Sequence, residues 1–141
     1  MRDKKPVSFL IFDIDKFKNY NDTFGHQQGD AALQTVARAL QNSVKRTTDF
    51  AARWGGEEFV ILLPSTDSEG AVNFAEEIRK AIEKVMIPCD DPNGIHVTVS
   101  IGANTLIPTK NSKVEAFISG ADEALYKAKE AGRNRVVHIG G

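Results

Sequence analysis

The chain has 141 residues, a length that fits one folded domain and excludes two independent ones. Hydrophobic residues make up 41% of it and charged residues 26%, a balance that excludes an intrinsically disordered or collagen-like protein. The 18 lysines and arginines against 19 aspartates and glutamates give a net charge of -1, too balanced for a protein that follows a long nucleic-acid backbone. Any nucleotide partner is therefore expected to be small.

The sequence shows no pattern typical of membrane or secreted proteins. Its strongly apolar runs, such as residues 59–63, are far shorter than the roughly 20 residues of a membrane-spanning helix, and no signal-peptide pattern opens it. A single cysteine, Cys89, cannot form an internal disulfide, which suits a reducing compartment. We expect a soluble, cytoplasmic protein with no membrane segment.

The first third of the chain predicts a buried strand and two helices. Residues 7–13 are nearly all apolar, which indicates a central strand buried on both faces. Asp15 follows at an N-cap position, ahead of a short helix over residues 16–23 that Gly25 ends. From residue 30 to about residue 46, apolar residues recur every three or four positions and predict a second helix with one face on a core.

Two apolar segments, residues 50–54 and 59–63, predict a β-hairpin. The connection between them begins with a Gly-Gly pair, which allows the positive φ angle of a tight turn, and continues with Glu57 and Glu58. Two carboxylates are therefore expected at the tip of the hairpin.

The second half of the chain predicts two more helices and two more strands. Amphipathic spacing predicts helices over residues 68–85 and 113–131, the first ended by turn-forming residues at 88–94. Residues 95–101 alternate between apolar and polar, which is typical of a strand with one face in solvent. Residues 135–139 predict a closing strand.

The order of the predicted elements is strand, two helices, hairpin, helix, strand, helix, strand. Such a mixture predicts one sheet with helices packed on it, and the core order βαββαβ predicts a ferredoxin-like α/β sandwich of the α+β type. Because folds of this kind have many functions, the function has to be argued from the site.

Three acidic residues fall at the ends of predicted strands, where side chains leave the core. If the hairpin pairs beside the first strand, Asp13, Glu57 and Glu58 meet at one edge of the sheet. Carboxylate oxygens together with a nucleotide phosphate suit Mg²⁺, which indicates a metal-phosphate site. The alternative is that Glu57 and Glu58 only solubilise a turn and that Asp13 helps Asp15 to cap a helix.

Backbone amides and basic side chains form a candidate phosphate site. The N–H groups around Lys16, Phe17 and Lys18, at the predicted start of a helix, suit phosphate oxygens, and the helix dipole adds to this. Lys129 and Arg133 lie four residues apart at the predicted end of the last helix, within reach of one anion. The alternative is that these two basic residues only complement the helix dipole.

Asn21, His26 and Asp30 form a polar cluster around the predicted break between the first two helices. A carboxylate accepts both the N1–H and the exocyclic amine of guanine, and an asparagine amide suits another edge of the base, whereas adenine offers no such donor pair. The cluster therefore indicates a guanine site. As structural alternatives, Asp30 is an N-cap, Asn21 ends a helix and His26 is an exposed loop residue.

Five blocks of sequence run in order along most of the chain: FDIDKFK (residues 12–18), NDTFGHQQGD (21–30), RWGGEEF (53–59), VSIGA (99–103) and ADEALYKAKEAGRNRV (121–136). In order and spacing they resemble the GGDEF domain of the diguanylate cyclase family, here with a GGEEF signature. The resemblance implies a fold similar to the palm of cyclases and polymerases. It also favours the functional alternative for each cluster described above.

The resemblance implies an enzyme that condenses two GTP molecules, one bound by each of two chains, into cyclic di-GMP and two pyrophosphates. Asp13, the Ile14 carbonyl, Glu57 and Glu58 would hold two Mg²⁺ ions per site, or Mn²⁺ in their place. Two metals roughly 3.5–4 Å apart suit an in-line displacement. Glu57 and Glu58 are the implied catalytic residues, with Glu57 activating the ribose 3′-hydroxyl.

Other family positions also match this sequence. Asp15 keeps its capping role, because the metal carboxylate of the family is the first of the two aspartates. The guanine-binding positions are matched by Asn21, His26 and Asp30, and the triphosphate-binding positions by Lys129, Arg133 and the backbone of Lys16, Phe17 and Lys18.

An RxxD pattern, Arg46 to Asp49, precedes the GGEEF block at the spacing of the family's inhibitory site. The resemblance implies that cyclic di-GMP binds there and inhibits the enzyme, since arginine can hold phosphate or stack on guanine and aspartate can contact the guanine edge. The alternative is a solvated pair at a helix end.

One departure from the family pattern concerns the N-terminus. Most members begin with an extra helical segment carrying a D-x-L-T and an N-R pair, whereas only residues 1–6 precede the first predicted strand here. We expect a single GGDEF domain over residues 1–141, short at its N-terminus and without a regulatory domain, with low activity in isolation.

Two other functions are weighed against the cyclase. A non-catalytic module that binds GTP or cyclic di-GMP is the main alternative, although such modules usually lose the GGEEF carboxylates that this chain retains. A polymerase-like palm acting on a nucleic-acid polymer is disfavoured, because the net charge of -1 offers no basic track.

Overall fold

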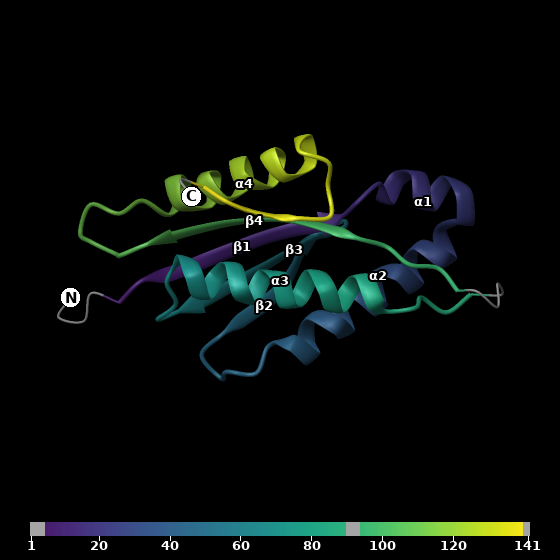
Figure 1. The fold of residues 1–141 in the computed structure, drawn as a ribbon, viewed down its shortest axis with the longest axis horizontal. Helices are drawn as coiled ribbons and strands as arrows, with labels where there is room; N and C mark the ends of the chain where they lie inside the picture. Colours follow the sequence, from purple (N-terminus) through teal and green to yellow (C-terminus); the bar gives the residue numbers. More distant parts are fainter. Residues whose placement is uncertain (1–4, 90–93, 140–141) are drawn as a thin grey trace.

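The computed structural model describes residues 5–89 and 94–139, which form a mixed sheet with helices on both faces (Figure 1). The spatial order of the strands is β2-β3-β1-β4-β5. Among the described residues, no helix has both the length and the apolar character needed to cross a membrane. The elements are β1 (Val7–Ile14), α1 (Phe17–Phe24), α2 (His26–Ser43), β2 (Phe50–Gly55), β3 (Glu58–Pro64), α3 (Ser68–Lys84), β4 (Val99–Leu106), α4 (Val114–Glu130) and β5 (Val136–His138).

β1 is the central strand of the sheet. It pairs antiparallel with β3 on one side and with β4 on the other, and β5 extends the sheet parallel to β4. The order β4-β1-β3-β2, with helices between β1 and β2 and between β3 and β4, is the βαββαβ arrangement that the sequence predicts. The predicted ferredoxin-like α+β fold is therefore confirmed.

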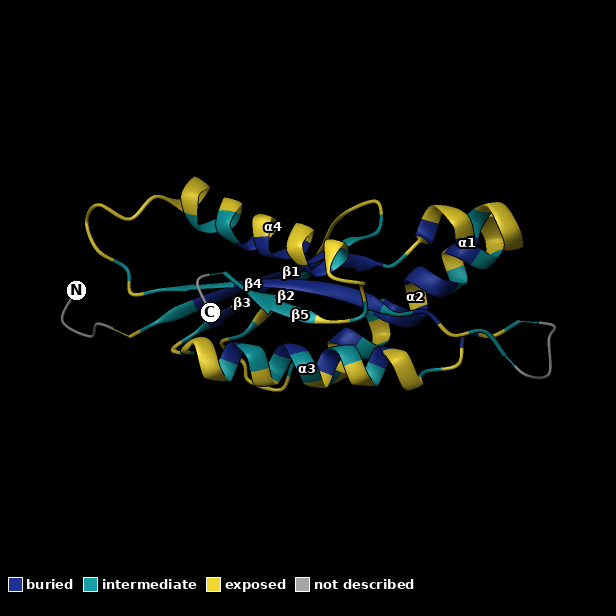
Figure 2. Cartoon of the chain, turned by 45° about the horizontal axis from the view of Figure 1, so that its top comes forward, coloured by how far each residue is buried: buried dark blue, intermediate teal, exposed yellow. Residues whose placement is uncertain are grey.

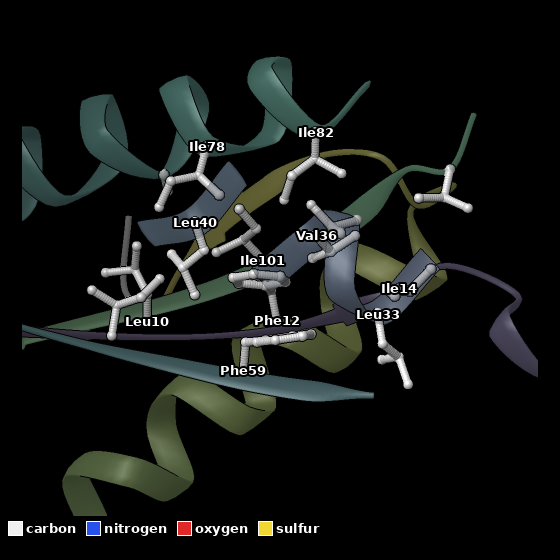
Figure 3. Packing of buried hydrophobic residues seen from close by; sticks show 14 of the residues in the cluster. Leu10, Phe12, Ile14, Leu33, Val36, Leu40, Phe59, Ile78, Ile82 and Ile101 are labelled. Carbon is white, nitrogen blue, oxygen red and sulfur yellow. The ribbon is translucent and has the colours of Figure 1, made fainter. Parts of the chain in front are cut away.

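Helices on both sides bury β1, which explains its continuous apolar sequence (Figure 2). Successive side chains of a strand point to opposite faces. Phe9 and Ile11 belong to the cluster under α4, while Leu10, Phe12 and Ile14 belong to the larger cluster under α2 and α3. Figure 3 shows this larger cluster between the sheet and the two helices. All residues of β1 after Val7 are buried.

The second helix begins four residues earlier than the sequence predicts. Gly25, with a φ angle of 90°, is both the C-cap of α1 and the N-cap of α2, so no loop separates the helices. The Gly25 N–H donates to the Asn21 carbonyl at 2.8 Å. Two structural alternatives are thereby wrong, because Asp30 does not cap a helix and His26 is the first residue of α2.

The strand predicted over residues 95–101 is displaced along the chain. β4 covers Val99–Leu106, and Ile95 forms only an isolated bridge with Ile87. The reason is pairing, since β4 follows β1 over its full length. The prediction of a solvent-exposed face is also wrong, because the first five residues of β4 are buried between helices on both sides. Residues 90–93 of the predicted turn lie outside the described residues.

Gly102 on β4 allows α4 to pack closely on the sheet. A Cβ at this position would lie 2.2 Å from the Ala121 carbonyl oxygen and 2.3 Å from the Leu125 backbone nitrogen. Both are backbone atoms of α4, so the steric clash of an added Cβ can be relieved only if the helix moves.

We expect Gly102→Ala to lower the free energy of unfolding by about 2–4 kcal/mol, because α4 has to move away from its core contacts. Gly55→Ala is the matched control, since a methyl group there meets no atom within 4 Å. Urea unfolding of both variants measures the difference. Equal stability losses in the two variants would contradict the close packing of α4.

Candidate functional site

The β1–β3 register brings the three predicted carboxylates to one end of the sheet. Asp13 is the ladder partner of Glu58, so the two side chains lie on the same face, and Glu57 occupies the turn directly before Glu58. One position further in, Phe12 stacks on Phe59 with ring centroids 5.1 Å apart. A shift of the β1–β3 register by one residue would turn a ring out of the core, so the packing of the two rings keeps Asp13 opposite Glu58.

The turn that carries Glu57 is stabilised by backbone geometry. Gly56 has a φ angle of 52°, in the left-handed region that favours glycine. Arg53 Nε donates a hydrogen bond to the Gly56 carbonyl at 2.8 Å, and a register shift between Arg53 and Gly55 precedes the last pair of the β2–β3 ladder, Gly55 with Glu58. This turn closes the hairpin that the sequence predicts.

Asp13 is a buried carboxylate with one charged partner. Its side chain is 10% exposed, and its Oδ2 accepts a hydrogen bond from Lys129 Nζ at 2.5 Å. Its Oδ1 is buried and has no hydrogen-bond partner among the described residues. Burial raises the pKa of Asp13 above its ordinary value, Lys129 opposes this, and the charges of Asp15 and Glu57 add to it. One carboxylate oxygen is therefore available to a further cation.

Glu58 adds a second carboxylate to the same electrostatic environment. Its pKa is raised, first by burial and then by the negative charges of Asp122 and Asp13. Two carboxylates, Asp13 and Glu58, thus lie near the single positive charge of Lys129. The unpaired Asp13 Oδ1 is suited to be a magnesium ligand. In their present arrangement, no three His, Cys, Asp or Glu side chains among the described residues are grouped closely enough to hold an ion. The cation at Asp13 in this structure is the Lys129 ammonium group.

Asp15 does not cap α1, so this prediction is wrong. The N-cap is Lys16, with a φ angle of 54°, and no side chain caps the helix. Asp15 instead accepts hydrogen bonds from Thr98 Oγ1 and Ser100 Oγ, each at 2.6 Å, and from the Asn134 N–H at 3.0 Å. These donors are 83, 85 and 119 positions away in the sequence, so no local pattern indicates them.

The start of α1 has the geometry of an anion site. The helix begins at Phe17, and the first N–H groups of an α-helix have no acceptor within the helix. Lys16 lines an open pocket of about 480 Å³ together with Asp15 and Arg133. Of the candidate phosphate residues Lys16, Phe17 and Lys18, only Lys16 lines this pocket, which has room for phosphate groups.

Asn21, His26 and Asp30 occupy the corner where α1 meets α2. Asn21 lies in the second half of α1, and Asp30 follows His26 by about one helical turn. The two helices approach closely, since a Cβ on Gly29 would lie 1.7 Å from Asn21 Oδ1, which is buried without a hydrogen-bond partner among the described residues. Asp30 is exposed and lines a separate pocket of about 320 Å³ with Arg53.

Lys129 and Arg133 do not share a helix face as predicted. α4 ends at Glu130, and Arg133 follows in a left-handed conformation with a φ angle of 66°. Lys129 contacts Asp13, whereas Arg133 lines the pocket beside Lys16. The helical spacing fails because the helix ends between the two residues. That Lys129 and Arg133 bind one common anion stays a prediction.

The residues that hold the turn after α4 are not predicted by the sequence pattern. Arg79 Nη1 donates to Asn134 Oδ1 at 2.9 Å, and Asn134 Nδ2 donates to Glu83 Oε2 at 2.6 Å. Arg79 also donates to both carboxylate oxygens of Glu76, which raises the pKa of Arg79. The spacing of Glu76 and Arg79 on α3 is a local signal for the contact between these two residues. No local signal indicates the contact between Arg79 and Asn134, which are 55 positions apart.

Arg46 and Asp49 form a bidentate pair at the far end of α2. Arg46 Nε and Nη2 donate to Asp49 Oδ1 at 3.0 and 2.6 Å, and Nη2 also donates to Thr66 Oγ1 at 3.0 Å. The Arg46 side chain is 47% exposed and that of Asp49 only 5%. Both line an open pocket of about 640 Å³. The pair is thus preformed, with the arginine accessible from solvent.

Comparison with known proteins identifies the family. A family model described as diguanylate cyclase, GGDEF domain, matches residues 1–135, so the chain belongs to the GGDEF domain family. The resemblance found in the sequence is thereby confirmed.

Two curated relatives carry the name of diguanylate cyclases. Diguanylate cyclase A of Treponema denticola is 44% identical over 133 residues, which cover 94% of this chain and 35% of the relative. Diguanylate cyclase DosC of Escherichia coli is 42% identical over 131 residues, which cover 93% of this chain and 28% of the relative. The chain thus spans about a third, or less, of the length of these relatives.

Solved structures share the fold. The GGDEF domain of DgcB from Caulobacter crescentus, crystallised in complex with c-di-GMP, is 33% identical with a TM-score of 0.87, covering 96% of this chain and 79% of that one. The active GGEEF domain of a diguanylate cyclase from Vibrio cholerae is 34% identical with a TM-score of 0.87, covering 98% and 85%.

Replacing Lys129 tests the electrostatic cost of the buried Asp13. Without the ammonium group, Asp13 lacks its charged partner, so we expect Lys129→Met to lower the free energy of unfolding near pH 7 by about 1–3 kcal/mol. Removal of Lys129 raises the pKa of Asp13 further. Because a protonated carboxyl group needs no cation, the loss should shrink as the pH falls through the acidic range.

The double variant Asp13→Asn/Lys129→Met is the matched control, since it removes both charges and should recover most of the stability near pH 7. Denaturant unfolding from about pH 4 to about pH 8 measures both variants. A stability loss in Lys129→Met that is the same at every pH would disprove this account of Asp13.

Proposed function

We propose that the chain is the catalytic domain of a diguanylate cyclase, which condenses two GTP molecules into cyclic di-GMP and releases two pyrophosphates. The observation that carries this proposal is the meeting of Asp13 with the Glu57–Glu58 hairpin tip in a chain that belongs to the GGDEF family. The open pocket of about 480 Å³ beside Lys16 adds to it. Support also comes from the two curated relatives, both diguanylate cyclases.

Metal binding is proposed at the buried end of β1. Asp13, the Ile14 carbonyl, Glu57 and Glu58 would hold two Mg²⁺ ions, which supply charge stabilisation for the attacking and leaving oxygens. Lys129 contacts Oδ2 of Asp13, so the unpaired Oδ1 would be the metal ligand. A metal at Oδ1 would repel the ammonium group and weaken its contact with Oδ2, which would make Lys129 available to a phosphate oxygen. Lys129 would then have one partner without nucleotide and another with it.

Glu57 is proposed to accept the proton of the ribose 3′-hydroxyl. Its position in the hairpin turn, beyond the last paired residues, lets its carboxylate approach a nucleotide bound outside the sheet edge. Glu58, which is paired with Asp13, is the better metal ligand of the two because its place in the ladder is fixed. Both remain acidic groups of the same catalytic site.

Nucleotide binding is proposed along α1 and its two ends. Asp30 would accept the N1–H and exocyclic amine of guanine, with Asn21 and His26 lining the same corner. The triphosphate would lie at the start of α1, on the backbone of residues 16–18, with Arg133 on the opposite wall of the pocket. This places base and phosphates at opposite ends of one short helix.

A second copy of the chain is proposed to complete the reaction. Each site would hold one GTP, and each 3′-hydroxyl would attack the α-phosphate of the nucleotide on the facing chain. An in-line displacement of this kind depends on the relative orientation of the two bound nucleotides. Enforced dimerisation should therefore increase the rate.

A fusion to a dimerising partner tests the proposal directly. With GTP and Mg²⁺, the fused chain should produce cyclic di-GMP, and Glu57→Gln should lower the rate by about 100-fold or more because the proton acceptor is lost. Glu123→Gln is the matched control, since Glu123 forms only an exposed pair with Lys127 at 3.7 Å. Chromatographic analysis of the products measures both.

A forced dimer that makes no cyclic di-GMP would refute the cyclase proposal. Tight binding of GTP or cyclic di-GMP in the same protein would then favour the alternative, a non-catalytic sensing module. Calorimetry on the dimer distinguishes this outcome from a protein that binds neither nucleotide.

Feedback inhibition is proposed at Arg46 and Asp49. The exposed guanidinium would bind a phosphate or a guanine face of cyclic di-GMP, and the pocket of about 640 Å³ beside it provides space. The preformed contacts of Arg46 to Asp49 and Thr66 keep the guanidinium in place before the ligand arrives. Such preorganisation lowers the cost of binding.

We expect Arg46→Ala to raise the cyclic di-GMP concentration that gives half-maximal inhibition by about tenfold or more, because a charge-assisted contact is lost. Initial rates of the forced dimer with added cyclic di-GMP measure this. Arg38→Ala, which removes an exposed arginine of α2, should leave the inhibition unchanged. Unaltered inhibition in Arg46→Ala would place the product site elsewhere.

A further inference from the structure

The turn between α4 and β5, residues 132–134, has an unfavourable backbone conformation. Gly132, Arg133 and Asn134 have φ angles of 125°, 66° and 47°, so two successive non-glycine residues lie in the left-handed region. This region is costly for L-residues because Cβ approaches the following carbonyl oxygen. Such a conformation persists only when surrounding contacts hold it. We call residues 132–134 the α4–β5 turn.

Hydrogen bonds from the Arg133 N–H to the Ala128 carbonyl and from Arg135 Nε to the Arg133 carbonyl, both at 3.0 Å, supply part of those contacts. Asn134 supplies the contacts that tie the turn to α3 and to the end of β1. Its backbone N–H donates to Asp15 Oδ2 at 3.0 Å, its Oδ1 accepts from Arg79 Nη1 at 2.9 Å, and its Nδ2 donates to Glu83 Oε2 at 2.6 Å. The side-chain amide thus has a partner on each end, and both partners lie on α3. The α4–β5 turn is therefore fixed from α3 on one side and from the end of β1 on the other.

Asp15 is itself held in place by hydrogen bonds to the segment before and at the start of β4. Its carboxylate accepts from Thr98 Oγ1 and Ser100 Oγ at 2.6 Å, and its own N–H donates to the Thr98 carbonyl at 2.8 Å. Its next neighbour is Lys16, the left-handed residue that begins the candidate phosphate site. Asp15 therefore joins the two walls of one pocket, the start of α1 and the turn that carries Arg133.

The charge of Asp15 is unfavourable for an anionic ligand. A carboxylate that lines a phosphate pocket repels the phosphate, and Asp15 forms no ion pair with a described residue that would neutralise it. Its contribution must then come from shape and hydrogen bonding, since its three accepted hydrogen bonds all come from neutral donors.

We propose that Asp15 is a positioning residue that orients Arg133 toward the phosphates of the bound nucleotide by fixing the backbone of the α4–β5 turn. This inference rests on the proposed function, because it takes the pocket beside Lys16 as the triphosphate site. Asp15 acts through Asn134 and contacts neither the nucleotide nor the metal. Arg133 itself is exposed, so without the fixed turn its guanidinium would sample many orientations.

The test compares two substitutions of Asp15. Asp15→Ala removes all three hydrogen bonds and should weaken GTP binding about tenfold, through Arg133. Asp15→Asn keeps the shape and, at the Oδ2 position, a carbonyl acceptor for Thr98 and the Asn134 N–H. The Ser100 hydroxyl can reorient to accept from the amide nitrogen at the Oδ1 position, so this variant should retain wild-type affinity within about threefold. A residue needed for its charge would give the opposite result, with both variants equally impaired.

Calorimetry with GTP and with GMP, each with Mg²⁺, gives the readout on the chain without enforced dimerisation. GMP shares the base but lacks the outer phosphates, so Asp15→Ala should change its affinity by less than about twofold. Asp67→Ala is the matched control, because that carboxylate also accepts a backbone N–H, from Gly70 at 2.8 Å, but caps α3. It should leave the ratio of GTP to GMP affinity unchanged.

A double-mutant cycle with Arg133→Ala tests whether Asp15 affects GTP binding through Arg133. If Asp15 acts through Arg133, Asp15→Ala should have no further effect on GTP affinity in the Arg133→Ala background. Additive losses, equal impairment of Asp15→Ala and Asp15→Asn, or an unaltered ratio of GTP to GMP affinity in Asp15→Ala would each overturn the proposal. If Asp15→Ala does not fold, failure of Asp15→Asn to bind GTP overturns it as well.

These outcomes are separate from those of the cyclase proposal. A wild-type chain that binds GTP but makes no cyclic di-GMP as a forced dimer contradicts the cyclase alone, and the affinity ratios still decide the role of Asp15. A wild-type chain that binds no GTP contradicts both, because the pocket beside Lys16 is then not a triphosphate site.

Discussion

The burial of the Asp13 carboxylate determines how residues are arranged at the end of β1. Asp13 continues a strand that is otherwise almost wholly apolar, and burial both raises its pKa and leaves Oδ1 without a partner. Folding alone does not favour this, because an unsatisfied buried polar atom costs stability. The cost is reduced by the ammonium group of Lys129, which reaches Asp13 from α4. The remaining electrostatic imbalance is what suits the site to bind cations.

Two aspartates that are two positions apart have different roles because their surroundings differ. Asp13 faces one ammonium group and other carboxylates, so its charge is only partly compensated. Asp15 faces two hydroxyl groups and a backbone N–H, so its hydrogen-bonding capacity is used within the fold. Asp13 lies in β1 and Asp15 directly after its end, yet only Asp13 has an oxygen without a partner among the described residues. Environment, rather than residue type, separates the two.

Most of the fold and the grouping of the acidic residues follow from local sequence. Apolar runs and helical spacing predict the elements, and the Gly-Gly turn predicts that Glu57 and Glu58 lie at a hairpin tip. Contacts between distant segments could not be predicted. The displacement of β4 follows from pairing with β1, and the partners of Asp15 and Lys129 are 83 or more positions away. Propensity and periodicity carry no information about such partners.

The close approach of α4 at Gly102 has an electrostatic consequence. Leu125, whose backbone lies against Gly102, is one helical turn before Lys129, and Gly102 is paired with Ile11, two residues before Asp13. The depth at which α4 lies on the sheet therefore determines how far the ammonium group must extend to reach its carboxylate. Gly102 has no side chain, yet its small volume influences the electrostatic surroundings of Asp13 through the depth at which α4 packs.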